Sequence, residues 1–270
     1  NIATLEQTCS VLGMKVDVHL KVDTGMGRIG VAVGEAGSLA EFIERDCPHL
    51  KLDGIYTHLP VSDDGDPTYT ENQIQRFIEI VEQVNHRIRR KLNLAHCSNS
   101  GGVLGHPSAW MDMVRPGIMI YGFYPGEDTP QTIPLKPGLS FITRVSFLKK
   151  VAAGTSIGYG RTWTSCEDTW IATIPVGYAD GFNRLFSNMG RVLINGKSYP
   201  IVGRVCMDQS MVNLGPVTDV QVGDEVVLIG KSGDEEISCY EWAKKLNTIT
   251  YEVTCQINAR VERVYEPPKI

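Results

Sequence analysis

Residues 16–22, Val16-Asp17-Val18-His19-Leu20-Lys21-Val22, form an apolar run that predicts a β-strand, and the elements that follow it decide the fold of the first half of the chain. Helical spacing of apolar residues follows at Val33–Glu44 and Thr70–Arg90. Further strands are predicted at Leu52–His58, Leu92–His96 and Met113–Tyr121. Strands that alternate with helices form parallel sheets covered by helices, so residues 1–123 are expected to form an α/β domain.

The helix at Thr70–Arg90 is the clearest of these elements. Its apolar side chains recur at helical spacing, at Ile74, Phe77, Ile78, Val81, Val84 and Ile88. Thr70 is expected to cap its N-terminus. The four predicted strands would form an open parallel sheet with two bare edges, which indicates that a segment is missing upstream of Asn1.

The composition changes between Phe123 and Gly138, where four prolines and two glycines fall within one short stretch. Such a stretch is typical of a domain boundary. Beyond it, short strands are predicted at Leu139–Lys149, Thr169–Val176, Val192–Ile194, Ile201–Val205, Met211–Leu214, Val226–Ile229 and Val253–Val264, with one helix at Cys239–Leu246. This pattern favours a β-rich domain.

The composition excludes several classes of protein. The 270 residues carry a formal net charge of −5, with 42% hydrophobic and 21% charged residues, which is typical of a soluble globular protein and argues against a nucleic-acid partner. The chain lacks an apolar run of membrane-spanning length and a signal-peptide pattern at its start. Its seven cysteines include no C-x-x-C pair, which favours reduced thiols in a cytoplasmic protein over disulfides or a metal site.

Three loops after predicted strands carry residues suited to chemistry, and α/β proteins place their sites at such strand ends. They are Lys21-Val22-Asp23-Thr24-Gly25-Met26-Gly27-Arg28, Thr57-His58 and His96-Cys97-Ser98-Asn99-Ser100-Gly101-Gly102. A loop of serines and glycines can bind phosphate through hydroxyl and backbone N–H groups. Taken alone, however, Lys21 could lie at the surface, His58 could be a structural hydrogen-bond partner, and the third loop could be a polar turn.

Arg115, in Arg115-Pro116-Gly117-Ile118, is a more specific signal, because an arginine on a strand is costly unless it has an acceptor. In the second half, Tyr159 lies between two glycines in Ser156-Ile157-Gly158-Tyr159-Gly160-Arg161-Thr162-Trp163, and glycine allows unusual backbone angles and close approach. The runs Gly177-Tyr178-Ala179-Asp180-Gly181 and Gly203-Arg204-Val205-Cys206-Met207-Asp208-Gln209 also end apolar strands. Each run could instead be an ordinary turn, with Asp180 or Asp208 as its cap.

In this order, the runs resemble the alanine racemase family, pyridoxal-phosphate enzymes of fold type III with an N-terminal β/α barrel and a C-terminal β domain. The resemblance covers nearly the whole chain and rests on K-V-D-T-G-M-G-R, T-H, N-S-G-G, R-P-G-I with Y-G, G-Y-G, P-V-G-Y-A-D-G and G-R-V-C-M-D-Q. It implies the C-terminal half of a TIM-like (β/α)8 barrel at residues 1–123, a linker at 124–138 and a β-rich domain at 139–270. It also implies a cytoplasmic homodimer with shared active sites.

The resemblance also implies roles for individual residues. Tyr159 would be the base on one face of a small amino-acid substrate, with Arg28 beside it and near the substrate carboxylate. Lys21 would be the lysine that is often carbamylated in the family. Pyridoxal 5'-phosphate would be bound by His58, Ser100, Arg115, Gly117 and Ile118, and the substrate entrance would be lined by Tyr178 and Met207 of a partner subunit.

Such an enzyme would interconvert L- and D-alanine and supply D-alanine for peptidoglycan. Racemisation removes and returns the Cα proton, so it requires a base on each face of the substrate. A phenol has an ordinary pKa of about 10, and the resemblance implies that the charge of Arg28 favours the ionised form. Arg115 cannot readily give a proton to the pyridine nitrogen, which disfavours side reactions such as transamination.

Two departures from the family pattern bear on these expectations. The family's cofactor lysine lies in a run like V-K-A-N-A-Y-G-H-G, which this sequence lacks, and roughly half of the eight barrel strands is absent with it. No lysine here is therefore assigned that role, and the chain is expected to be a fragment or to depend on another segment. Ala259 stands where many members have a tyrosine, which could widen the pocket towards serine.

Three alternatives therefore stand beside an alanine racemase. The first is a serine/alanine racemase of broader specificity. The second is a non-catalytic, truncated racemase-like module that keeps the fold's surfaces for association. The third, a pyridoxal-phosphate decarboxylase on the same barrel, fits less well, because the G-Y-G and G-Y-A-D-G runs are typical of racemases.

Overall fold

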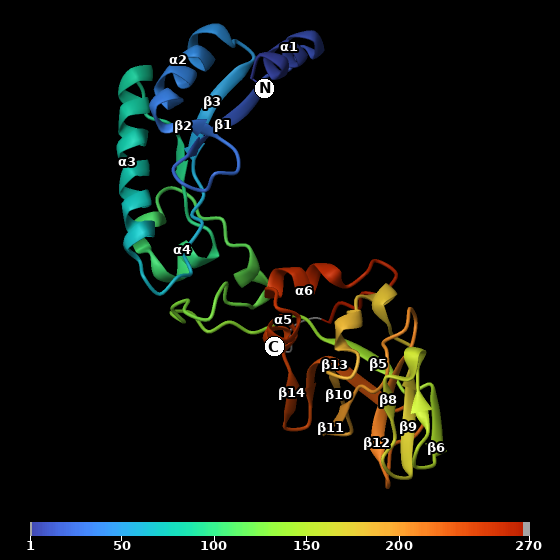
Figure 1. Ribbon diagram of the computed structural model, residues 1–270. Helices are drawn as coiled ribbons and strands as arrows, with labels where there is room; N and C mark the ends of the chain where they lie inside the picture. Colours follow the sequence, from blue (N-terminus) through green and yellow to red (C-terminus); the bar gives the residue numbers. More distant parts are fainter. Residues whose placement is uncertain (1, 267–270) are drawn as a thin grey trace. The chain divides into compact units, whose positions relative to one another are not determined.

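The computed structural model describes residues 2–266, and the chain divides into two compact units, residues 1–137 and 138–270 (Figure 1). The division falls at the end of the stretch rich in proline and glycine. Within this stretch, the Tyr124 hydroxyl donates to the Ile133 carbonyl at 2.9 Å, and the Thr132 hydroxyl donates to the Leu104 carbonyl at 2.9 Å. The first bond closes the segment on itself, and the second ties it to the rest of the first unit.

The first unit is built on a parallel sheet with the strand order β2-β1-β3-β4, which confirms the predicted α/β class. The strands are β1 (Val16–Asp23), β2 (Val31–Ala32), β3 (Leu50–Tyr56) and β4 (Leu94–His96). The helices are α1 (Ile2–Leu12), α2 (Ala36–Asp46), α3 (Thr68–Ile88) and α4 (Ser100–Gly105), with short 3-10 turns η1 (Val33–Glu35), η2 (Pro107–Ala109) and η3 (Ile118–Tyr121).

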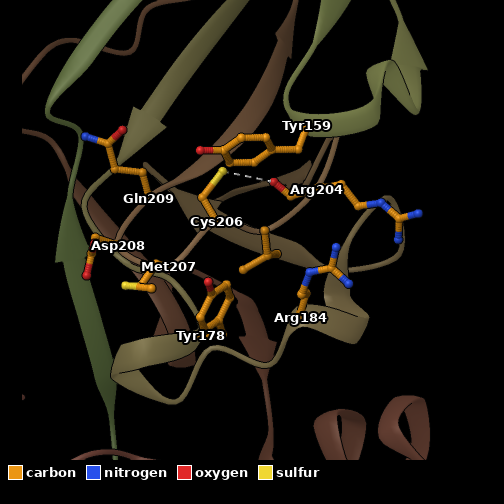
Figure 2. Close-up of a pocket in the computed structure, with 9 residues that line it drawn as sticks. Tyr159, Tyr178, Arg184, Arg204, Cys206, Met207, Asp208 and Gln209 are labelled. Atoms are coloured by element: carbon orange, nitrogen blue, oxygen red, sulfur yellow. Dashed lines mark hydrogen bonds between the residues drawn. The ribbon is translucent and has the colours of Figure 1, made fainter.

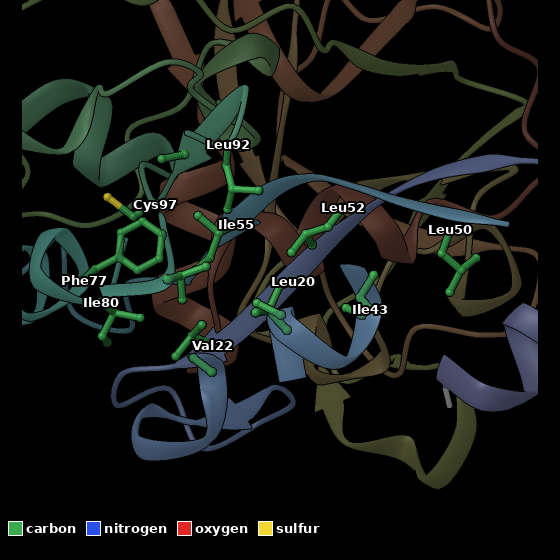
Figure 3. Packing of buried hydrophobic residues seen from close by; sticks show 14 of the residues in the cluster. Leu20, Val22, Ile43, Leu50, Leu52, Ile55, Phe77, Ile80, Leu92 and Cys97 are labelled. Atoms are coloured by element: carbon green, nitrogen blue, oxygen red, sulfur yellow. The ribbon is translucent and has the colours of Figure 1, made fainter. Parts of the chain in front are cut away.

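Helices α2 and α3 pack side by side on one face of this sheet (Figure 1). The core between the sheet and these two helices is made by apolar side chains of β1, β3, α2 and α3 (Figure 3). Leu20, Val22, Leu52, Ile55 and Phe77 are at most 5% exposed there. Burying side chains of this size contributes roughly 1.5–3 kcal/mol each, so this interface holds the unit together.

The same strands present polar residues to the opposite face of the sheet. Successive side chains of a strand point to opposite faces, so Leu20 and Val22 face the helices while His19 and Lys21 face away from them. Gly54 of β3 makes room for the His19 ring, because a Cβ there would lie 2.8 Å from its Cε1 atom. Polar residues of this face form the site described below.

Two predictions in the first unit are wrong. The strand predicted at Met113–Tyr121 is absent: residues 113–117 are irregular, Ile118–Tyr121 form η3, and the fourth strand of the sheet is β2 instead. Pro116 has no N–H to donate to a strand ladder, and the Arg115 N–H bonds the carbonyl of Ser98, in the loop after β4, at 2.9 Å. Thr70 does not cap α3, which begins at Thr68 with Pro67 at the cap position.

The second unit is β-rich, as predicted. One sheet has the strand order β11-β10-β13-β14, with β5 also paired to β13, a second has the order β12-β9-β6, and β7 pairs with β8. The strands are β5 (Phe141–Arg144), β6 (Phe147–Val151), β7 (Ser156–Ile157), β8 (Trp163–Thr164), β9 (Thr169–Ile174), β10 (Arg191–Ile194), β11 (Lys197–Pro200), β12 (Ser210–Gly215), β13 (Glu225–Ser232) and β14 (Glu235–Ile237).

Up to residue 266, where the described part of this unit ends, the remaining elements are α-helices and short 3-10 turns. They are η4 (Tyr159–Arg161), η5 (Tyr178–Asp180), η6 (Arg184–Phe186), α5 (Cys239–Leu246) and α6 (Thr250–Gln256). The prediction for α5 is confirmed at both ends. The strand predicted at Val253–Val264 is wrong, because its start belongs to α6, which packs on α5. The strand predicted at Ile201–Val205 is reduced to one bridge between Ile201 and Val212.

Candidate functional site

Arg115 is the centre of a polar cluster in the first unit. Its guanidinium donates to the carbonyl oxygens of Thr57 at 2.8 Å and Cys97 at 3.3 Å, and it bonds Nδ1 of His96. Burial lowers the pKa of Arg115 from its ordinary value. Three acceptors around one half-buried guanidinium fix its position, so the arginine that the sequence singled out has the partners it needs.

The hydrogen bond from Arg115 also fixes the tautomer of His96. Arginine can only donate, so Nδ1 of His96 accepts and its proton lies on Nε2. That nitrogen lies 2.8 Å from Nδ1 of His19, which therefore accepts in turn. Burial, followed by the charge of Arg115, lowers the pKa of His96 to about 4, so His96 is neutral near pH 7.

The sequence reasoning gave no role to His19 or His96. Both histidines lie on predicted strands. The two-residue alternation of side chains along β1 and β4 could have placed them on the face of the sheet opposite the helices. The Tyr56 ring, also on this face, stacks on His96 with ring centroids 5.1 Å apart. Of these three rings, His96 bonds Arg115 directly, while Tyr56 and His19 hold His96 in place.

Lys21 lies on the same face, and among residues 2–266 its buried Nζ atom finds no hydrogen-bond partner. The atom lies 5.4 Å from the centroid of the Tyr56 ring. Burial lowers the pKa of Lys21, with smaller effects from Asp23, which raises it, and from Arg28 and Arg115, which lower it. A buried amine among positive charges without an acceptor indicates a place for an anionic partner.

Arg28 follows a loop that Asp23 holds in place. The Asp23 carboxylate accepts from the backbone N–H groups of Gly25 at 2.9 Å and Gly27 at 3.0 Å, and these bonds lower its pKa. Arg28 itself is exposed, and its charge lowers the pKa values of both Lys21 and His58. The structure therefore brings Arg28, Lys21 and His58 into one electrostatic environment, as the sequence predicted for the ends of parallel strands.

The loop of serines and glycines lies next to this cluster. Asn99 caps α4 by accepting from the Gly102 N–H at 3.0 Å. The Ser100 hydroxyl accepts from the N–H groups of Gly117 at 2.9 Å and Met119 at 3.4 Å. Ser100, Gly117 and Ile118 are thereby gathered at one place, where hydroxyl and backbone N–H groups suit a phosphate.

The glycines of this region differ in what they permit. A Cβ at Gly117 would meet only the Ser100 hydroxyl, at 3.9 Å, so the space above it is open. A Cβ on Gly101 or Gly102 would collide with Ser62 or Ser98, so those two glycines serve packing. The open space next to the Ser100 hydroxyl is therefore at Gly117.

Tyr159 lies in the second unit on η4, between Gly158 at φ 73° and Gly160 at φ 71°. Both glycines have angles that other residues rarely adopt. A Cβ on Gly158 would also lie only 3.0 Å from Cε of Met211 and 3.2 Å from the backbone nitrogen of Arg204. The tight turn leaves the tyrosine side chain 73% exposed, so its phenol points out of the unit that carries it.

Tyr159 forms one wall of a pocket of about 530 Å³ (Figure 2). Tyr178 and Met207, which the sequence predicted to line a substrate entrance, lie in the same pocket. The other lining residues are Arg184, Arg204, Val205, Cys206, Asp208 and Gln209. The sequence reasoning did not single out the two arginines, which give the pocket positive charge suited to a carboxylate.

Two further properties are limited to the part of the chain that the structure describes. Within residues 2–266, no group of three or more histidine, cysteine, aspartate or glutamate side chains is placed to hold a metal ion. The helices of the same residues are all too short or too polar to cross a bilayer.

The chain thus joins an α/β unit, with a polar cluster suited to an anion at its strand ends, to a β-rich unit that exposes Tyr159, and this defines a two-domain protein of mixed α/β and β-rich class. Residues 1–125 match the family description "Alanine racemase, N-terminal domain", and residues 139–265 match "Alanine racemase, C-terminal domain". The chain therefore belongs to the alanine racemase family, whose members depend on pyridoxal 5'-phosphate. The first unit is accordingly part of a β/α barrel.

Individual relatives agree with this assignment. The alanine racemase of Chlorobaculum tepidum is 46% identical over 259 residues, which is 96% of this chain and 66% of that protein. The alanine racemase structure from E. faecalis is 40% identical with a TM-score of 0.85, and covers 92% of this chain and 65% of that one. The alanine racemase structure from Clostridium difficile 630 is 36% identical with a TM-score of 0.91, and the match covers 98% of this chain and 68% of that one. The chain thus spans about two thirds of the length of these relatives.

Proposed function

We propose that the full-length protein is a pyridoxal-phosphate-dependent racemase that interconverts L- and D-alanine. The observation that carries the proposal is the outward presentation of Tyr159 on a glycine turn beside a pocket with two arginines. A solvent-exposed phenol on a rigid turn suits a base that acts on a substrate held by another surface. The family membership supplies the reaction class, and similarity to alanine racemases favours alanine over serine.

The residues of the first unit fit the cofactor. Ser100, Gly117 and Ile118 would hold its phosphate, Arg115 would face its ring nitrogen, and His58 would lie against the ring. The fit rests on the Ser100 hydroxyl and the open space at Gly117, since both suit the phosphate of the cofactor. When bound, the cofactor supplies the electron sink for the pair left when the Cα proton departs.

The chain's own residues would then act as follows. Tyr159 takes the Cα proton on one face or returns it there, and a base on the opposite face performs the complementary transfer, so protons balance. Arg115 stays a donor that cannot yield its proton readily, because His96 and two carbonyl oxygens hold its guanidinium. Arg28 would bind the substrate carboxylate, while Tyr178 and Met207 would line its entry path.

Lys21 is proposed to be carbamylated. Burial lowers its pKa and so increases the fraction of neutral amine. A neutral amine adds to CO2 with loss of one proton, which leaves a carbamate of charge −1. The new oxygens would satisfy the buried position and offset the charges of Arg28 and Arg115. A carbamate carbon signal in a ¹³C spectrum recorded with labelled bicarbonate, absent in Lys21→Ala, would support this step.

The assembly proposed is a cytoplasmic homodimer in which Tyr159 of one subunit serves the barrel unit of its partner. The exposed position of Tyr159, Tyr178 and Met207 supports this, since all three are more than 40% exposed within the chain. The D-alanine produced would serve peptidoglycan synthesis. Cross-linking and light scattering of the full-length protein would test the dimer.

The experiment that tests the function measures racemisation of L- and D-alanine by full-length protein loaded with cofactor, together with Tyr159→Phe and Tyr265→Phe. Tyr265 is 89% exposed and lies outside the pocket, so it is the matched control. We expect Tyr159→Phe to lose at least 100-fold of the rate, within the range of a general base. Racemisation in both directions by Tyr159→Phe at the control rate would refute the role of Tyr159. A full-length protein that stays colourless with the cofactor would favour a non-catalytic module.

A further inference from the structure

Arg260 joins three segments of the second unit through one guanidinium. Its Nε atom donates to Oδ1 of Asp180 at 2.7 Å, and its Nη2 atom donates to Oδ1 of Asp208 at 2.7 Å. Asp180 belongs to η5, Asp208 lies in the loop before β12, and Arg260 follows α6. The two carboxylates raise the pKa of Arg260, so the charge of this link persists at all ordinary pH values.

The two turns that Arg260 joins form one wall of the pocket in Figure 2. The N–H groups of Tyr178 and Ala179 donate to the carbonyl oxygens of Cys206 at 3.1 Å and Met207 at 3.0 Å. Gly177 permits this contact, since a Cβ there would collide with the same two carbonyls. Backbone bonds therefore align the turns, and Arg260 is the side-chain link between them.

Arg260 is delivered to this position by the tail that follows α6. The Asn258 N–H donates to the Asp180 carbonyl at 3.2 Å, and the Asn258 side chain accepts from the Arg260 N–H at 3.1 Å. The other oxygen of Asp180 accepts from the Gly177 N–H at 2.8 Å. Asp180 is thereby held at both oxygens, and Arg260 meets it in a fixed geometry.

The second carboxylate is different, because Asp208 lines the pocket and its side chain is 58% exposed. Its charge would oppose the carboxylate of an amino acid entering the pocket, while Arg184 and Arg204 would attract it. The ion pair with Arg260 offsets that charge and restrains the Asp208 side chain. Without the guanidinium, the negative charge of Asp208 in the pocket would be uncompensated.

We propose that Arg260 is a positioning residue for the substrate path: it holds the Tyr178 and Met207 turns together and offsets the charge of Asp208. This proposal rests on the proposed racemase function, because the substrate of that reaction carries a carboxylate. The side-chain bonds of Arg260 go to Asp180 and Asp208 and to neither the cofactor residues nor Tyr159, within residues 2–266. Loss of the guanidinium should therefore affect substrate entry. The expected signature is a change in KM with little change in kcat.

The test compares three variants of the full-length protein: Arg260→Gln, Arg263→Gln and the double variant Arg260→Gln with Asp208→Asn. Arg263 is the matched control, since it lies on the same tail and donates to main-chain carbonyls of Ile257, Asn258 and Val261. We expect Arg260→Gln to raise the KM for alanine about five- to tenfold, from the loss of two partly exposed ion pairs. The double variant should recover the part of that loss that comes from the uncompensated charge of Asp208, since the amide that replaces the carboxylate is neutral, and should keep the part that comes from the lost link to Asp180.

A second readout does not depend on activity. In hydrogen exchange measured by mass spectrometry, residues 177–181 should exchange faster in Arg260→Gln than in Arg263→Gln. An unchanged KM and unchanged exchange in Arg260→Gln would overturn the proposal, as would equal effects of the two single variants. A protein without racemase activity but with faster exchange in Arg260→Gln would keep the link between the turns and refute the proposed function alone.

Discussion

The neutral state of His96 makes the stability of the first unit depend on pH. His96 is 3% exposed, and its pKa is lowered from 6.5 to about 4, chiefly by burial and then by Arg115. In the unfolded chain the imidazole binds a proton below pH 6.5, whereas in the folded chain it does so only below about pH 4. Protonation therefore favours the unfolded state as the pH falls between these values.

The size of the effect follows from the same two values. The stabilisation is fully present above pH 6.5, and its loss amounts to about 2 kcal/mol by pH 5 and about 3 kcal/mol by pH 4. The perturbation that isolates it is His96→Gln. A glutamine can accept from Arg115 through its oxygen and donate to His19 through its nitrogen, so the variant keeps the hydrogen bonds without the titration.

The assay is urea unfolding of the full-length protein and of His96→Gln at pH 7, 6 and 5, with cofactor at one fixed concentration. Other titrating groups, including His58, whose pKa is also lowered by burial, are common to both proteins and cancel in the difference. We expect the free energy of unfolding to fall by about 2 kcal/mol more in the wild type between pH 7 and 5. Parallel profiles, or an NMR titration of His96 with a midpoint near 6.5, would refute the reasoning.

Two further predictions concern the second unit and the thiols. Asn188 adopts φ 57° and accepts from the Gly203 N–H at 2.6 Å, so Asn188→Ala should lower the free energy of unfolding by about 2 kcal/mol and Asn188→Gly by about 1 kcal/mol, measured by urea unfolding; equal losses would show that the backbone angle is unimportant. In the native protein, a thiol reagent should label the exposed Cys166 and Cys255 within minutes, and labelling of a buried cysteine at the same rate would contradict the described packing. Burial raises the pKa of two of the protected thiols, to about 12 for Cys97 and about 11 for Cys239.

Local patterns predicted much of the fold and failed where tertiary contacts decide. Helix α5 was predicted at both ends, because its cap and its periodicity are local. Residues 251–257 alternate apolar and polar side chains as a strand does. Residues 251–256 nevertheless lie in α6, because Thr250, Val253 and Ile257 are buried at helical spacing. The segment 113–121 is apolar enough for a strand, but Pro116 has no N–H for a strand ladder, and the segment instead bonds the loop after β4 through Arg115 and ends in η3.

The candidate site shows the same division. The sequence singled out the runs that hold Lys21, Arg28, His58 and Ser100 because such runs end strands that a parallel sheet places side by side. It singled out Arg115 because an arginine on a strand is costly unless it has an acceptor. It could not show that His96 contacts Arg115. That contact depends on the register between β3 and β4 and on the path of the chain after β4.

The sequence alone determined the alternation of elements, the division near residue 138 and the runs that resemble one family, since each is written in neighbouring residues. Only the tertiary structure decided that the Nζ atom of Lys21 is buried without a partner, that His19 and His96 support Arg115, and that Arg260 joins Asp180 to Asp208. These contacts join residues up to 80 positions apart. No local periodicity records such contacts, because strand pairing and side-chain packing bring their residues together only in the folded chain.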